Sequence, residues 1–166
     1  CVAGASQRDA AKAAVDAFVD LGAEASWPGP ISAGRGGDFL HAPLSDAPLA
    51  AGDIVHIELI PRVEGYSGRI MRCVSIGQPS AELARAAETL AALQDRQIAA
   101  IKPGAIAGDV DAILRDAVLK AGLRREFDHI SGYTLGLYSH ATPRTSDFTR
   151  IFHPGATWTI EKDMTF

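Results

Sequence analysis

The chain has 166 residues, of which 47% are hydrophobic and 22% are charged, and its formal net charge is −4. This length suits one domain with a substantial core. The acidic balance excludes a basic footprint for nucleic acid and a polybasic membrane patch, and no apolar run approaches the roughly 20 residues of a membrane-spanning helix.

Cysteine content indicates the cellular setting. Cys1 and Cys73 are too few for a disulfide scaffold and favour a reduced, cytoplasmic location. The chain begins at Cys1 without a methionine and shows no signal peptide, so we expect a trimmed or partial chain.

The first predicted element is a helix over residues 10–21. Ser6 and Asp9 resemble a capping box ahead of it, and Gly22 ends it. Two short strands are expected next, at residues 31–34 and 39–41.

The most informative stretch is a predicted hairpin at residues 52–72. Residues 54–60 are expected to form one strand and residues 66–74 the returning strand. Alternation places His56 and Glu58 on the same face of the first strand. An imidazole and a carboxylate facing inward are costly unless they are solvated, paired or metal-bound, so this hairpin is the candidate floor of a site.

Helices dominate the next part of the chain. Ser80 begins a long predicted helix that runs to about residue 100, and a further helix is expected over residues 109–121. Residues 127–138 and 156–161 are predicted strands, with a loop at residues 143–154 between them.

An internal repeat relates the two halves of the chain. At an offset of about 100 residues the spacing of Gly, Ala and Asp in the first helix recurs, and Ile57-Glu58 later recurs as Ile160-Glu161. His41 falls near His140 in the same comparison. We expect one domain, residues 1–166, built of halves at about residues 1–79 and 80–166.

Several motifs in this order resemble the pita-bread domain shared by methionine aminopeptidases, Xaa-Pro peptidases and creatinase. They are the helix opening at residues 3–6, the strand and histidine loop at 32–41, the GD…GY hairpin at 52–72, the histidine-rich segment at 129–143 and the PG…TIE segment at 154–161. The resemblance implies an α+β fold of two pseudo-twofold-related halves. In it a central, mostly antiparallel sheet is covered by helices, and here the C-terminal hairpin is truncated.

The resemblance also implies a metal centre whose ligands are largely missing. Aminopeptidases of this family hold two divalent metals with two aspartates, one histidine and two glutamates. Here Glu58 and Arg69 stand at the aspartate positions, Tyr133 at the histidine and Glu161 at one glutamate, and the last glutamate is expected beyond the end of the given sequence. Ala141 replaces the glutamate that follows the histidine of the HE motif. Because Arg69 is a permanent cation that cannot ligate, we expect no metal cofactor.

Three histidines keep positions that matter in the family. His41 matches the acid–base histidine of the metal-free creatinase branch, His140 the substrate-side histidine, and His129 the histidine that precedes the GH pair. The resemblance therefore implies His41 and His140 as catalytic residues and His129 as a substrate contact. His56 and His153 are interpreted as structural or surface residues.

The remaining site residues each allow two interpretations. Glu58 and Arg69 form either a buried pair that fills the vacated metal site, or a site in which Arg69 holds a substrate carboxylate. Tyr133 either bonds a substrate carbonyl or fills the space of a lost histidine. Glu161 either contacts substrate or pairs with Arg69 or Arg72.

The leading functional hypothesis is a metal-independent hydrolase that cleaves a C–N bond in a small amino-acid-like or guanidino substrate. The alternative is an inactive pseudo-peptidase that binds a peptide or small ligand. A weaker alternative is a mononuclear metallo-aminopeptidase with one ion on Glu58, Glu161 and a histidine. Expected partners are a small-molecule or short-peptide substrate and a second copy of the chain as a homodimer, with no nucleic acid and no membrane.

Overall fold

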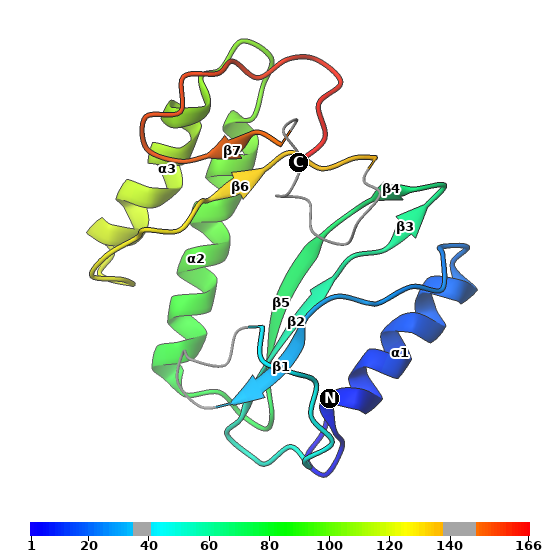
Figure 1. Cartoon of the computed structure of the whole chain (residues 1–166). Helices are drawn as coiled ribbons and strands as arrows, with labels where there is room; N and C mark the ends of the chain where they lie inside the picture. The colour runs from blue at the N-terminus through cyan, green and yellow to red at the C-terminus, as the bar shows by residue number, and fades with distance from the viewer. Residues whose placement is uncertain (35–40, 138–148) are drawn as a thin grey trace. The chain divides into compact units, whose positions relative to one another are not determined.

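The computed structural model describes residues 1–34, 41–137 and 149–166. Within it the chain forms two units, one made of Cys1–Pro79 with the segment that begins at Gly136, the other of Ser80–Leu135 with the C-terminal segment that ends at Phe166. Figure 1 labels the elements of both. The single domain and the internal repeat expected from the sequence stay predictions.

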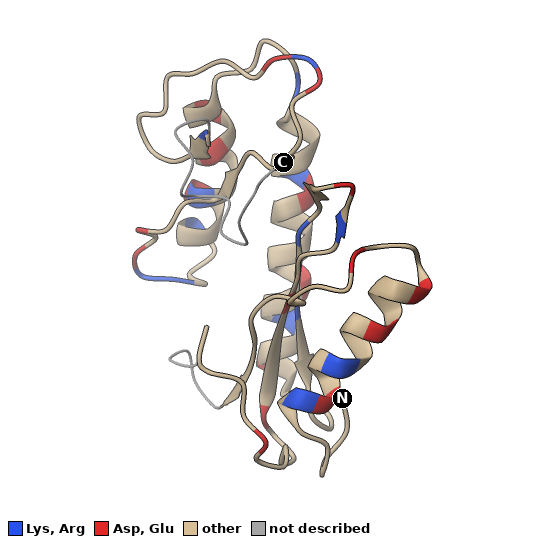
Figure 2. Cartoon of the chain, turned by 45° about the vertical axis from the view of Figure 1, so that its right-hand side comes forward, with Lys and Arg blue, Asp and Glu red and all other residues tan. Residues whose placement is uncertain are grey.

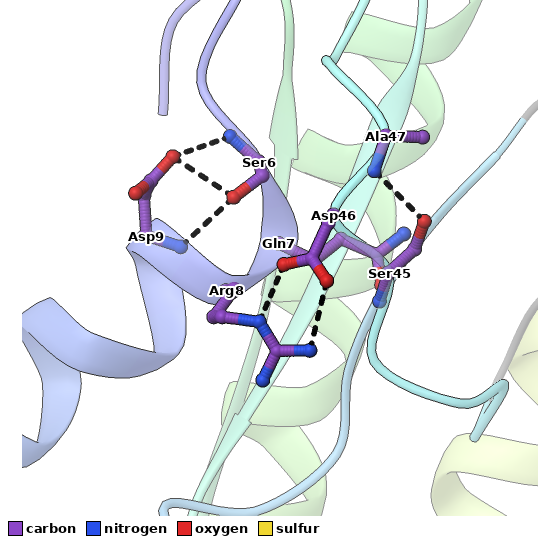
Figure 3. A network of polar contacts seen from close by, with 7 residues as sticks. All are labelled: Ser6, Gln7, Arg8, Asp9, Ser45, Asp46 and Ala47. Carbon is purple, nitrogen blue, oxygen red and sulfur yellow. Dashed lines mark hydrogen bonds and ion pairs between the residues drawn. The ribbon is translucent and has the colours of Figure 1, made fainter.

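Helix α1, Gln7–Asp20, begins where the capping box predicts. The Ser6 hydroxyl accepts a hydrogen bond from the Asp9 backbone at 3.2 Å, and the Ser6 backbone donates to the Asp9 carboxylate at 2.7 Å. Figure 3 shows this box beside the contacts of Arg8 with Asp46. These contacts hold the loop before β2 against the start of the helix.

The first unit contains an antiparallel sheet of order β1-β2-β5. Its strands are β1, Ile31–Gly34, β2, Ile54–Leu59, and β5, Ile70–Ser75. The returning strand predicted at 66–74 is interrupted: β3, Arg62–Val63, and β4, Tyr66–Ser67, form a separate small ladder before β5. Gly68 donates to the Pro61 carbonyl at 3.1 Å at this break.

The two faces of this sheet differ in chemistry. On one face the fully buried Val55 pairs with Ala33 and Val74 and packs toward α1 (Figure 1). Its buried core comprises Ala11, Ile31, Leu49, Val55 and Ile76. The other face carries His56 and Glu58, as the predicted alternation requires.

The second unit begins with α2, Ala81–Ala100, and α3, Ala107–Lys120. Ser80 caps α2 by accepting from the Leu83 backbone at 3.1 Å. The short strands β6, Gly132–Tyr133, and β7, Ile151–Phe152, pair antiparallel. The buried core of this unit comprises Ala107, Val110, Phe152, Ala156 and Ile160.

Two strand predictions and one loop prediction were wrong in extent. Residues 127–137, the described part of one predicted strand, contain only β6 and isolated bridges, and residues 156–161 make a single bridge. Residues 149–154, the described part of the predicted loop, contain β7. The segment at 156–161 instead accepts hydrogen bonds from the start of α3. The N–H groups of Ala107 and Gly108 donate to the carbonyls of Trp158 and Ala156 at 3.0 and 2.9 Å. Ile106, the cap of α3, has no side chain that could satisfy these donors, so the strand-like segment does.

His41 was expected in a strand at 39–41 and lies instead in a turn, whereas residues 39 and 40 fall outside the described residues.

A buried network ties α3 to the segment before β6. Arg115 donates to Asp111 through Nε at 2.6 Å and Nη2 at 2.9 Å, and also bonds the carbonyls of Phe127 and His129. Ser131 donates to Asp111 at 2.6 Å. This network holds an otherwise irregular segment in place.

Charge on the helices is mixed in sign. Figure 2 shows basic and acidic residues mixed in the first half of α1 and acidic residues alone in its second half. In the described part of the chain, no helix combines the length and apolarity that crossing a membrane requires.

The close approach of Gly29 to strand β2 predicts that any side chain at this position lowers the stability of the protein. Its φ is +120°, and a Cβ there would overlap the carbonyl oxygen of Glu58. We expect Gly29→Ala to lower the free energy of unfolding by about 2–3 kcal/mol, measured by urea denaturation. Gly22→Ala is the control, because Gly22 has φ +84° but no atom within 4 Å of its would-be Cβ. The control should lose only about 1 kcal/mol; equal losses would contradict the proposed overlap.

The Asp111–Arg115 pair should contribute far more stability than an exposed pair of the same spacing. Asp111→Asn leaves the buried Arg115 cation without its counter-charge, so we expect a loss of about 3–5 kcal/mol in urea unfolding. Asp16→Asn is the matched control, since Lys12 and Asp16 form an exposed i,i+4 pair. It should change stability little. A small loss for Asp111→Asn would show that Arg115 finds other partners.

Candidate functional site

A cluster of side chains surrounds Glu58 in strand β2. The Glu58 side chain is fully buried, and two histidines approach the same oxygen, Oε2. His41 Nε2 lies 3.1 Å from it and His56 Nε2 lies 3.4 Å from it. His56 reaches Glu58 because residues two apart on a strand share a face.

Arg69 contacts the other oxygen of the same carboxylate. Its Nη2 meets Glu58 Oε1, and its side chain is 12% exposed. Arg69 lies in the break between β4 and β5, immediately before Ile70, which pairs with Leu59 of β2. The Glu–Arg pair considered from the sequence therefore forms, whereas the role of Arg69 as a clamp for a substrate carboxylate stays a prediction.

His41 is the accessible member of the cluster. Its side chain is 52% exposed, and its backbone has φ +60°, a region that few residues other than glycine adopt. It also lines a pocket of about 380 Å³ whose other walls are mainly apolar, among them Trp27, Pro30 and Leu44. A ligand in this pocket would reach the imidazole. Backbone strain of this kind is often found at functional sites.

His56 occupies a different environment from His41. Its side chain is 8% exposed. Burial lowers the pKa of His56 below its ordinary value, and the nearby His41 and Arg69 lower it further. We therefore expect a neutral His56 imidazole at neutral pH, which can donate one hydrogen bond to Glu58.

Ser32 adds a buried hydroxyl to this face. It pairs directly with His56 across β1 and β2, so its side chain lies on the face that carries the cluster. It is fully buried, and among the described residues its Oγ has no hydrogen-bond partner.

The other predicted site residues lie elsewhere. His140 falls outside the described residues. His129, Tyr133 and Glu161 belong to the second unit, where His129 and Glu161 are exposed and Tyr133 is partly buried. Their convergence with His41 and Glu58 stays a prediction.

The interpretation of His56 as a structural or surface residue did not place it in the cluster. His56 is buried against Glu58, which excludes the surface alternative and agrees with a structural role. The signal was present in the alternation of the strand, which already placed His56 on the face of Glu58.

The donor set does not fit a two-metal centre. Arg69, which the resemblance places at one of the two aspartate positions, is a cation that already pairs with Glu58. The donor set fits a single metal ion better than two. The candidate ligand atoms of His41, His56 and Glu58 lie within 4.8 Å of one another. Within residues 1–34, 41–137 and 149–166, no other such group of three was found.

Curated relatives match most of the chain. The probable dipeptidase PepE of Mycobacterium tuberculosis is 33% identical over 138 residues, which cover 82% of this chain and 37% of that protein. The Xaa-Pro dipeptidase of Pyrococcus furiosus is 30% identical over 132 residues, 79% of this chain and 38% of that protein.

Solved structures agree. Dipeptidase PepE from Mycobacterium ulcerans superimposes with a TM-score of 0.74 at 31% identity, covering 98% of this chain and 42% of that one. The chain thus spans about two fifths of the length of these relatives. The sequence model of metallopeptidase family M24 matches residues 1–166. This chain therefore belongs to metallopeptidase family M24, with the pita-bread fold of that family.

Proposed function

We propose that this chain is a hydrolase domain that works without the two-metal centre of its family. It would cleave a C–N bond of a small amino-acid-like or guanidino substrate, with His41 as the group that moves protons. The observation that carries the proposal is the Glu58–Arg69 ion pair beside an accessible histidine.

The charge of Arg69 supports chemistry without two metals. Two divalent ions would polarise a carbonyl and generate hydroxide at neutral pH. A guanidinium cannot bind a metal ion, and that of Arg69 neutralises Glu58, the carboxylate of the cluster. The remaining polar groups beside Glu58 are two imidazoles, which suit general acid–base catalysis.

The pocket beside His41 supports a compact organic substrate. Its volume of about 380 Å³ falls in the range of small-molecule sites, and its walls, including Trp27 and Pro43, are mostly apolar. Relatives named as a dipeptidase and an Xaa-Pro dipeptidase favour a dipeptide-like substrate with an apolar residue next to the scissile bond. His140 would assist from the substrate side, and His129, Tyr133 and Glu161 would complete the site.

An inactive ligand-binding module is the second candidate. Arg69 and Tyr133 stand at two positions where the resemblance implies metal ligands, which favours loss of activity with retention of a binding cleft. Thermal stabilisation by peptides without turnover would distinguish it from an enzyme. For either candidate the free thiols of Cys1 and Cys73 support a cytoplasmic setting, and a homodimer stays the expected assembly.

A mononuclear metal enzyme is the third candidate, and the convergence of His41, His56 and Glu58 favours it. This donor set differs from the one expected from the sequence, because His56 takes the place of Glu161. The adjacent guanidinium of Arg69 opposes it by repelling a cation.

Removal of the His41 imidazole should abolish hydrolysis. We expect His41→Ala to lower kcat/KM by roughly 10²–10⁴-fold on whichever substrate is turned over in a panel of Xaa-Pro dipeptides, other dipeptides and guanidino acids. His153→Ala is the control, because His153 is a histidine of the second unit outside the cluster. Unchanged turnover in His41→Ala would remove this mechanism, and a panel without any turnover would favour the binding module.

Metal content should distinguish the first and third candidates. After purification in buffer containing Zn²⁺ and Mn²⁺, elemental analysis of the wild-type protein should find no equimolar metal, because Arg69 repels a cation. The variant Arg69→Asp restores a carboxylate beside Glu58 and should raise the bound metal. One equivalent of metal in the wild-type protein, lost in His56→Ala, would instead support the mononuclear enzyme.

A further inference from the structure

Glu58 determines which nitrogen of His41 and of His56 carries a hydrogen. A guanidinium on Oε1 favours the ionised carboxylate, and an ionised carboxylate only accepts hydrogen bonds. The two Nε2 atoms at 3.1 and 3.4 Å from Oε2 must then each carry a hydrogen. In a neutral imidazole with Nε2–H, the other nitrogen, Nδ1, is bare and can accept a proton.

The two histidines differ in what they can reach. The buried His56 shares Oε2 with His41 and lies too deep to meet a ligand in the pocket. The His41 side chain is half exposed and lines the pocket. Only His41 therefore combines a fixed tautomer with access to substrate.

We propose that Glu58 is a positioning residue that holds His41 as the Nε2–H tautomer, so that Nδ1 is the atom that exchanges protons with substrate. His56 and Arg69 support this by holding the two oxygens of the carboxylate in place. The inference deepens the proposed hydrolase and rests on it for the catalytic role, but the tautomer itself can be tested without any substrate.

Hydrolysis by this arrangement needs water as its only co-reactant, and His41 ends the reaction in the protonation state in which it began. Nδ1 takes a proton from the attacking water as the C–O bond forms. The same proton then passes from Nδ1 to the leaving nitrogen as the C–N bond breaks, which restores the bare nitrogen. Throughout, Glu58 stays ionised and stabilises the imidazolium through Nε2–H.

Imidazole nitrogen shifts test the tautomer directly. Long-range ¹H–¹⁵N spectra of the labelled wild-type protein are recorded at increasing pH until the imidazole nitrogen shifts no longer change, so that the neutral form is observed. We expect His41 to show a bare Nδ1 and a protonated Nε2. His153 is the internal contrast, because its Nδ1 lies 2.7 Å from the Pro154 carbonyl, which can only accept, and so should carry the hydrogen.

The opposite tautomer for His41, or an average of both forms as in free imidazole, would overturn the proposal. Assignment uses His41→Gln and His153→Gln, each of which removes one set of signals.

Glu58→Gln should reverse the tautomer. The amide oxygen would turn to the Arg69 cation and the amide N–H₂ to the histidines, which makes Nε2 of His41 an acceptor. We expect its Nδ1 to become protonated, and kcat to fall roughly 100-fold with KM changed only a few-fold. A circular dichroism spectrum like that of the wild-type protein shows that the variant folds. If the variant does not fold, the nitrogen spectra of the wild-type protein still test the tautomer. An unchanged tautomer or unchanged kcat in E58Q would contradict the role of Glu58.

The positioning of His41 by Glu58 and the hydrolase activity can each be contradicted without the other. A bare Nδ1 in a protein without turnover would support the positioning by Glu58 and remove the hydrolase. Turnover that depends on His41, together with a protonated Nδ1, would support the hydrolase and remove the positioning.

Discussion

A fully buried carboxylate stands at the centre of the first unit, and the surrounding side chains are arranged to compensate its charge. Burying an ionised carboxylate costs several kcal/mol unless it is paired and hydrogen-bonded. Glu58 meets this requirement with a guanidinium on one oxygen and two imidazoles on the other. One of these contacts joins the buried carboxylate to the accessible His41.

Local backbone structure makes this compensation possible. The interruption at Gly68 separates β4 from β5 and brings Arg69 to Glu58, while the left-handed turn at His41 brings a loop histidine onto the same carboxylate. On the opposite face of β2, Val55 anchors the strand in an apolar core under α1. The sheet thus separates a dry packing face from a polar face, and one strand serves both by alternation.

Within metallopeptidase family M24, this chain has the pita-bread fold and places a guanidinium and two imidazoles on one buried carboxylate. The guanidinium of Arg69 balances the negative charge of Glu58. Histidine is well suited to such a setting because it can hold, accept or donate one proton near neutral pH.

Sequence patterns alone were enough for the locally encoded features. The capping box at Ser6, the helix that starts after Ser80, the strand at 54–60 and its two unlike faces all depend on residues close in sequence, and each was confirmed in type. The family followed from motif order. Predictions failed where a distant partner decides the outcome. The segment at 156–161 has strand-like composition, but its carbonyls satisfy the open N–H groups at the start of α3.

The same distinction applies to the site. The sequence by itself determined which residues stand at the family positions, and that Arg69 cannot ligate a metal. Only the tertiary structure decided that His56 joins His41 on one oxygen of Glu58, because no local pattern sets the distance between a turn and the middle of a strand. That distance depends on the packing of the whole unit.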